Sequence, residues 1–157
     1  MISKGATTIW ERWDTDTQDG GMNGESQKIL SGTFEAWCYQ TLAGINYDRE
    51  QPGFKHIILK PQPVGDLASA RGTYKSPYGL IESDWKVTND QMNWHFTVPP
   101  NTTATVYLPT DAAESTTESG KPIATTGAIR TLRQDANAVV LSVGSGKYQF
   151  ACHCKRP

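Results

Sequence analysis

The sequence predicts a mainly β fold, an antiparallel β-sandwich of seven to eight strands preceded by a loop and one amphipathic α-helix. Three observations lead to this prediction. A polar, glycine-rich stretch fills residues 14–28, apolar residues at helical spacing follow it, and from residue 55 onward apolar and polar residues alternate with period two. Turn residues recur every eight to twelve positions in this second part, as hairpin-connected strands require.

Length and composition indicate one ordinary globular domain. The chain has 157 residues, 15 basic against 16 acidic side chains and a formal charge of -1. A chain with almost no net charge is not expected to have nucleic acid or an anionic membrane as its main partner, because both are held by an excess of positive charge. No stretch approaches the ~20 apolar residues of a membrane span, and the first ten residues lack the apolar core of a signal peptide. We therefore expect no membrane partner, and the sequence predicts no cellular location.

The single helix is predicted over residues 32–43. Ser31 or Gly32 can cap its start, and Gly44 supplies a left-handed residue that ends it. We expect Trp37 to face a partner surface. The apolar residues placed on one helix face by their spacing are Phe34, Trp37, Cys38, Leu42 and Ile45.

Short strands account for the rest of the chain. The clearest is 92–98, where Trp94 and its apolar neighbours alternate with polar residues, and Trp85 has the same position in an earlier strand. Both tryptophans are therefore expected in the core. Residues 76–79 and 89–90 supply hairpin turns, and 110–121 is predicted as a loop. The expected strands are 55–60, 67–75, 79–87, 92–98, 104–108, 128–133, 138–143 and 146–154.

Three cysteines, Cys38, Cys152 and Cys154, are an odd number and indicate no disulfide framework. Alternation in a strand turns Cys152 and Cys154 to one side and His153 to the other, so we expect two small apolar side chains on an inner face. The sequence accordingly predicts no metal site and no cofactor. The lone histidines, His56 and His95, are expected in structural or exposed positions.

The N-terminal segment has a different character. Residues 5–20, GATTIWERWDTDTQDG, carry two tryptophans, one glutamate and three aspartates without strand alternation. Rings that stack on the CH faces of sugars, together with carboxylates that bond hydroxyls, are typical of a carbohydrate site. Carbohydrate is therefore the expected ligand class.

The strings GATTIWERWDT (5–15), MNGESQ (22–27), EAWCYQTLAGINYD (35–48) and PGFKHIILKPQP (52–63) occur in an order that resembles the C-terminal end of bacterial α-L-rhamnosidases of glycoside hydrolase family 78. The resemblance implies a catalytic (α/α)₆ barrel followed by a β-sandwich. It implies that residues 1–50 are the remnant of the barrel's C-terminus and that 51–157 form the sandwich domain.

The same resemblance implies that Glu11 is the general base. An inverting glycosidase needs a second carboxylate ~6.5–9.5 Å away to protonate the leaving oxygen. In this family the general acid lies far upstream, and the acids that follow Glu11 match no such motif; they are Asp14, Asp16, Asp19 and Glu25. The isolated chain is therefore predicted to be inactive.

Trp10 and Trp13 form a wall of the sugar pocket if the family pattern holds, or one buried face of a helical turn if it does not. Many relatives carry an Asn-His pair that contacts sugar before the helix. This sequence has Ser26, Gln27, Lys28 and Ile29 there, so that contact is missing.

Two other functions remain open. The chain can be a carbohydrate-binding module, with Tyr74, Tyr78 and Tyr107 on turns or outward positions as candidates. It can also be a structural cap on the barrel. In that case the exposed face of helix 32–43 needs a partner. Without the barrel, Phe34, Trp37 and Leu42 either fold back onto the sandwich or form a homodimer through this face, and we expect some dimer.

Overall fold

The computed structural model describes Ser3 and residues 33–154. The chain forms two compact units, Met1–Ala36 and Trp37–Pro157, and the second unit contains every described strand. The predicted loop 14–28 lies outside the described residues.

The predicted helix is present, but only its first half is α-helical. The α-helix α1 spans Thr33–Trp37, and a π-helix, η5, continues over Cys38–Leu42. The N–H of Ala43 donates to the carbonyl of Cys38, five residues back, at 3.0 Å. The assignment of Ile45 to the helix face was wrong, because Gly44 turns the chain at a φ of 75° and Ile45 begins a strand in the core.

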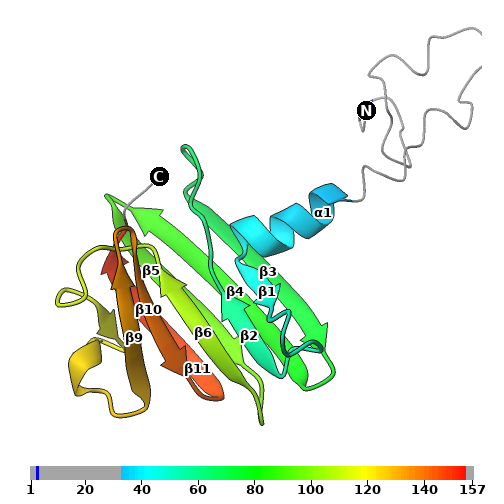
Figure 1. Cartoon of the computed structure of the whole chain (residues 1–157). Helices are drawn as coiled ribbons and strands as arrows, with labels where there is room; N and C mark the ends of the chain where they lie inside the picture. The colour runs from blue at the N-terminus through cyan, green and yellow to red at the C-terminus, as the bar shows by residue number, and fades with distance from the viewer. Residues whose placement is uncertain (1–2, 4–32, 155–157) are drawn as a thin grey trace, which may run out of the picture. The chain divides into compact units, whose positions relative to one another are not determined.

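Two β-sheets stack face to face and form the sandwich (Figure 1). The first, sheet A, has the strand order β1-β2-β6-β10-β9, and the second, sheet B, has the order β3-β4-β5-β11-β7-β8. The strands are β1 (Ile45–Tyr47), β2 (His56–Leu59), β3 (Ser69–Ser76), β4 (Gly79–Thr88), β5 (Gln91–Val98), β6 (Thr103–Leu108), β7 (Thr117–Glu118), β8 (Lys121–Pro122), β9 (Ile129–Asp135), β10 (Ala138–Val143) and β11 (Gly146–His153).

The mainly β sandwich is confirmed, and the eight strands of four or more residues lie where the alternation predicted them. One pairing departs from the antiparallel expectation, because β2 runs parallel to β6. No hairpin joins these two strands: after β2 the chain crosses to sheet B, forms β3, β4 and β5, and only then returns. Parallel neighbours need such a crossover.

Three short strands, β1, β7 and β8, were not predicted. The last two form a small hairpin inside the expected loop 110–121, with Ser119 and Gly120 at its turn. Both turn residues have positive φ, 49° and 77°, as a type I′ turn requires. The N–H of Ser119 donates to the carbonyl of Gln149, which attaches the hairpin to β11.

The core lies between the inner faces of the sheets. Trp85 and Trp94 are fully buried, as predicted, and every second residue of β5 points inward. The Phe96 and Phe150 rings stack with centroids 5.6 Å apart and planes 6° apart, across the β5–β11 pair. Such aromatic stacking adds to the free energy gained by burying the apolar area.

The cysteines of the last strand are buried small side chains, as expected. Cys152 and Cys154 are 1% and 3% exposed, and His153 between them is exposed. Burial, and then the neighbouring Cys154 thiol, raise the pKa of Cys152 to about 12. All three cysteines are free thiols.

The two strand histidines also have the expected roles. His56 bonds the hydroxyls of Thr103 and Thr105 across the β2–β6 pair, at 2.7 and 2.9 Å, and His95 is exposed. Within residues 33–154, no helix is long and apolar enough to cross a membrane.

Candidate functional site

The residues predicted to carry catalysis and sugar contact, Glu11, Trp10 and Trp13, lie outside the described residues. The acids that follow Glu11 and the positions 26–29 lie there too. The roles of all these residues stay predictions.

Buried hydrogen bonds attach the end of η5 to strand β4. The indole N–H of Trp85 donates to the carbonyl of Leu42 at 2.7 Å, and the hydroxyl of Ser83 donates to the carbonyl of Ala43 at 2.6 Å. The indole N–H of Trp94 donates in turn to the Ser83 hydroxyl at 3.0 Å. The two bonds of Ser83 are buried, so water does not compete for them, and the Trp85 bond to the half-buried Leu42 is part-buried.

The chain just after η5 also lies against residues 60–63. The N–H of Lys60 donates to the carbonyl of Gly44 at 2.8 Å, and the N–H of Gln62 donates to the carbonyl of Thr41 at 2.9 Å. A Cβ atom on Gly44 would lie 2.2 Å from the backbone nitrogen of Pro61. Only glycine allows this close approach, and it also accepts the positive φ.

The three candidate tyrosines occupy different surroundings. Tyr74 pairs with the buried Ile81 and so lies on the inner side of sheet B, but on the edge strand β3 it is still 40% exposed; its ring centre lies 4.6 Å from that of Phe54. Tyr78 lies on the β3–β4 turn and is 40% exposed, with the Lys55 ammonium 5.2 Å from its ring. Tyr107 alone of the three lies on the outer face of a sheet, between its inward neighbours Val106 and Leu108.

A hollow of about 200 Å³ lies on the outer face of sheet B, where charged side chains from neighbouring strands meet. Its carboxylates already have partners. Asp84 lies 3.8 Å from Arg71, and Glu82 accepts a hydrogen bond from the hydroxyl of Thr97 at 3.0 Å. The ion pair is more than half exposed and contributes little. The lining residues are Arg71, Glu82, Asp84, His95, Phe96, Thr97, Lys147 and Tyr148.

A second hollow, of about 150 Å³, lies beside Tyr107. We call it the Tyr107 hollow; it is lined by Lys60, Pro61, Gln62, Pro63, Tyr107, Pro109, Asn137 and Ala138. The Lys60 ammonium lies 5.0 Å and the Arg133 guanidinium 5.7 Å from the centre of the Tyr107 ring. Of these residues, sequence reasoning named Tyr107 alone. Nothing in the spacing of residues 60, 107 and 137 indicates that they meet.

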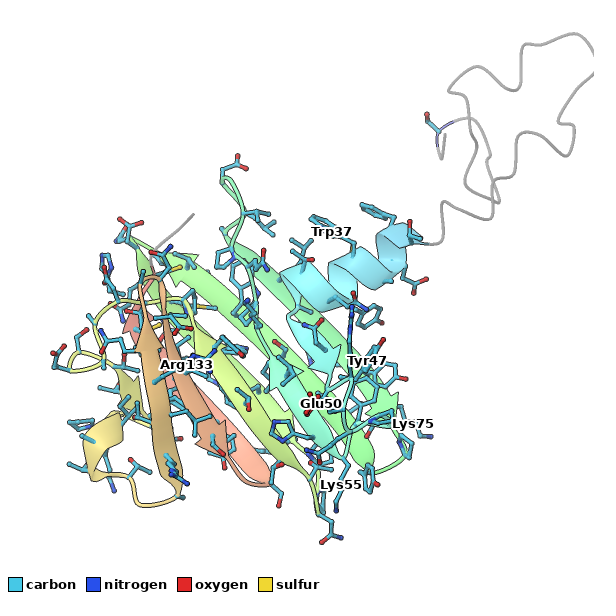
Figure 2. All side chains as sticks on the ribbon, viewed as in Figure 1. Trp37, Tyr47, Glu50, Lys55, Lys75 and Arg133 are labelled. Carbon is cyan, nitrogen blue, oxygen red and sulfur yellow. The ribbon has the colours of Figure 1, made fainter. Side chains whose placement is uncertain are left out.

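Arg133, labelled in Figure 2, lies on β9 and contacts both Tyr107 and Asp135. Its guanidinium donates to the Tyr107 hydroxyl at 3.4 Å and to the Asp135 carboxylate at 3.0 Å. The hydrogen bond to Tyr107, and then the bond and charge of Asp135, raise the pKa of Arg133. Arg133 therefore keeps its positive charge, which the Asp135 carboxylate partly balances. Within residues 33–154, no group of three or more His, Cys, Asp or Glu side chains could hold a metal ion.

Comparison with known families matches two adjoining models. Residues 44–122 match the bacterial alpha-L-rhamnosidase C-terminal domain, and residues 1–42 match the bacterial alpha-L-rhamnosidase 6 hairpin glycosidase domain. The change of model at residues 42–44 falls at the end of η5, where the buried bonds to β4 begin. The boundary predicted near residue 50 stays a prediction.

Individual relatives agree with the family models. The chain is 32% identical over 153 residues to an alpha-L-rhamnosidase of Formosa agariphila and 33% identical over 153 residues to one of Streptomyces avermitilis. These matches cover 95% of this chain but only 16% and 14% of the relatives. The chain therefore spans about a sixth of the length of the curated relatives it matches.

Solved structures give the same result. The chain is similar to the Streptomyces avermitilis alpha-L-rhamnosidase complexed with L-rhamnose, with a TM-score of 0.76 and 30% identity over 96% of this chain and 14% of that one. It is also similar to the alpha-L-rhamnosidase from Dictyoglumus thermophilum, with a TM-score of 0.77 and 31% identity over 96% of this chain and 16% of that one.

Proposed function

The chain belongs to the bacterial α-L-rhamnosidase family, and from this premise we propose that it serves as the C-terminal part of an inverting glycoside hydrolase that acts on rhamnosyl glycans. One observation carries the proposal. The sequence runs from the end of a hairpin-type glycosidase domain at residues 1–42 into a C-terminal domain at 44–122, in one continuous match.

The chemistry explains why this part does not act alone. Inversion needs a base that takes a proton from the attacking water and an acid that protonates the leaving oxygen. By resemblance Glu11 is the base, and the 157 residues contain no match to the motif of the acid. One carboxylate cannot complete the reaction, so the isolated polypeptide does not hydrolyse rhamnosides.

The first test is release of p-nitrophenol from p-nitrophenyl α-L-rhamnopyranoside by the purified chain. We expect the chain to release p-nitrophenol no faster than its Glu11→Gln variant does, because neither protein has a general acid. Turnover that Glu11→Gln abolishes would mean that the chain holds a complete catalytic pair, and the proposed inactivity would be wrong.

The role of Glu11 is tested in a chimera that joins this chain to the barrel of the Streptomyces avermitilis relative. Glu11→Gln should lower kcat by about a hundredfold or more, the usual loss on removing a general base. Glu35→Gln is the matched control, since Glu35 is an exposed acid in the first turn of α1. Equal activity of both variants would exclude Glu11 as the base.

A structural role of the sandwich is the second candidate, and the buried bonds from Trp85 and Ser83 to the end of η5 support it. These bonds hold the last turn of the helical segment on a rigid β-sheet. In a complete enzyme a sandwich attached in this way caps the barrel and fixes its final helix. A third role, non-catalytic binding of carbohydrate, depends on the outer surface of the sandwich.

A further inference from the structure

A buried apolar residue, Val140, lies beside Tyr107 on the outer face of sheet A. Val140 on β10 pairs with Tyr107 on one side and with Arg133 on the other, so its side chain points outward with theirs. Val140 is nevertheless fully buried and is not part of the core between the sheets. Neighbouring side chains on the outer face therefore cover Val140, which lies beside Tyr107 but does not itself line the hollow.

The Tyr107 ring is held in place before any ligand arrives. Cations from two strand regions distant in sequence, Lys60 and Arg133, lie over the ring, and Arg133 also bonds the phenol oxygen. A cation over the face of an aromatic ring is attracted by the negative charge of that face. These contacts hold the Tyr107 ring in one position. Because the two cations lie over the ring, a sugar is expected to contact its edge and its hydroxyl group.

Part of the lining is equally rigid. It contains the buried Pro61 and Pro63 and the half-buried Pro109, and their rings fix the backbone. The backbone bonds of Lys60 to Gly44 and of Gln62 to Thr41 attach this part of the lining to the end of η5. A ligand that enters the hollow therefore meets a surface that costs little conformational entropy to organise.

The polar groups of the Tyr107 hollow are rich in donors and contain no acid. Lys60 contributes an ammonium, Gln62 and Asn137 contribute amides, and the lining contains neither Asp nor Glu. Within residues 33–154, no carboxylate lies within ion-pair distance of Lys60. The Tyr107 oxygen accepts from Arg133, which leaves the phenol proton for another acceptor.

From these observations we propose that the Tyr107 hollow is a binding site for one acidic sugar unit, a pyranose that carries a carboxylate. The ammonium of Lys60 and the phenol proton of Tyr107 bind the carboxylate, the amides of Gln62 and Asn137 bond ring hydroxyls, and the proline rings contact the CH groups. The volume suits a single sugar ring rather than a drug-sized ligand. The choice of a sugar rests on the proposed function, and the choice of an acid rests on the charge of the lining.

The test is a titration of the whole 157-residue chain, followed by amide chemical shifts in two-dimensional NMR. The probe is methyl β-D-glucopyranosiduronate, and the matched neutral sugar is methyl β-D-glucopyranoside, in which a hydroxymethyl group replaces the carboxylate. We expect saturable shifts at Gln62, Tyr107, Asn137 and Ala138 with the uronate. Binding of the neutral sugar should be weaker by about tenfold or more, because a charge-assisted bond is lost.

Two variants locate the contact. Lys60→Gln should weaken uronate binding by about tenfold while the spectrum keeps its dispersion. Lys86→Gln is the control, since Lys86 is an exposed lysine on the outer face of sheet B and should leave the affinity unchanged. Tyr107→Phe removes only the phenol oxygen and should weaken binding by a smaller factor.

The proposal is wrong if no saturable shift appears at these amides, if both sugars bind equally, or if Lys60→Gln binds like the control. Sodium acetate that reproduces the whole effect at the same concentration would also overturn it, because the site would then recognise an anion without a sugar. No hydrolysis is measured, so a negative result does not affect the proposal of a hydrolase part.

Discussion

Ser83 is the residue on which the junction between helix and sandwich depends most. Its hydroxyl is fully buried, accepts from the indole of Trp94 and donates to the carbonyl of Ala43. A single oxygen thus satisfies a donor and an acceptor that have no access to water. Its position within the alternation of β4 predicts an inward side chain, but only the structure identifies its two partners.

Ser83→Ala should lower the free energy of unfolding by about 2–3 kcal/mol, because it leaves the Trp94 N–H and the Ala43 carbonyl unpaired. Urea denaturation followed by tryptophan fluorescence measures the change. The control is Ser69→Ala, since Ser69 is exposed at the start of β3 and should change stability by less than ~0.5 kcal/mol. Equal effects of the two variants would contradict the importance of the buried bonds.

Cys152 makes stability depend on pH in the alkaline range. Its pKa in the folded chain is about 12, above its ordinary value of 9.0, because burial disfavours the thiolate. The folded state therefore keeps the proton while the unfolded state loses it. The stabilisation is complete below pH 9 and is lost progressively as the pH rises toward 12.

Between pH 9 and pH 10.5 the native chain should lose about 2 kcal/mol more stability than a Cys152→Val variant, at ~1.4 kcal/mol per pH unit. Comparing the two proteins cancels the titration of lysines and tyrosines. Urea midpoints at the two pH values provide the measurement. Parallel pH dependence of both proteins would mean that the thiol is not shielded from solvent.

The turn from η5 into β1 depends on one glycine. Gly44 combines a φ of 75° with a close approach to the backbone of Lys60 and Pro61. The sequence shows only the first condition, since a glycine after a helical pattern predicts a C-terminal cap. The contact with Pro61 depends on the pairing of β1 with β2, which brings the two segments together.

Gly44→Ala should destabilise the chain by about 3 kcal/mol or more, because the new methyl group meets backbone that cannot move aside. Gly120→Ala is the matched control, since Gly120 has nearly the same φ, 77°, with no atom within 4 Å of the new carbon. It should cost only about 1–2 kcal/mol for the left-handed backbone. Thermal unfolding by circular dichroism compares them, and similar losses would show that the contact with Pro61 is unimportant.

The alternation of apolar and polar residues predicts the longer strands but not the three short ones. The eight longer strands alternate over several residues and are bounded by turn residues, and all were predicted. Strand β1 has three residues and follows a helix, so Ile45 fitted the helical spacing as well. Strands β7 and β8 have two residues each; the Ser119–Gly120 turn was their only sequence signal.

For the whole molecule, the exposed aromatic residues of the helical segment bear on assembly. Phe34 on α1 is 64% exposed, and Trp37, which Figure 2 labels at the end of the same helix, is 43% exposed. In the absence of a barrel, burial of each large side chain in a second copy is worth ~1.5–3 kcal/mol. A symmetric dimer through this face remains our expectation for the isolated chain.

Light scattering should show a mass that rises above 17.3 kDa with concentration. Trp37→Glu should keep the chain monomeric, because it places a charge in the contact. Tyr47→Glu is the control, since Tyr47 is 46% exposed on β1, outside the helical face. A strict monomer at millimolar concentration, or equal dissociation by both variants, would contradict the dimer.

Local sequence by itself determined the eight longer strands, the inward positions of Trp85 and Trp94, the hairpin turns at 76–79 and 89–90, and the family to which the chain belongs. Alternation, turn residues and the T-T-x-W-E-x-W string are all properties of neighbouring residues. The parallel pairing of β2 with β6, the inward direction of Tyr74 and the meeting of Lys60, Tyr107 and Asn137 were decided only by the tertiary structure. Contacts between strands far apart in the chain depend on which strand edges and faces remain available after the local elements form. The alternation of apolar and polar residues within one strand contains no information about this choice.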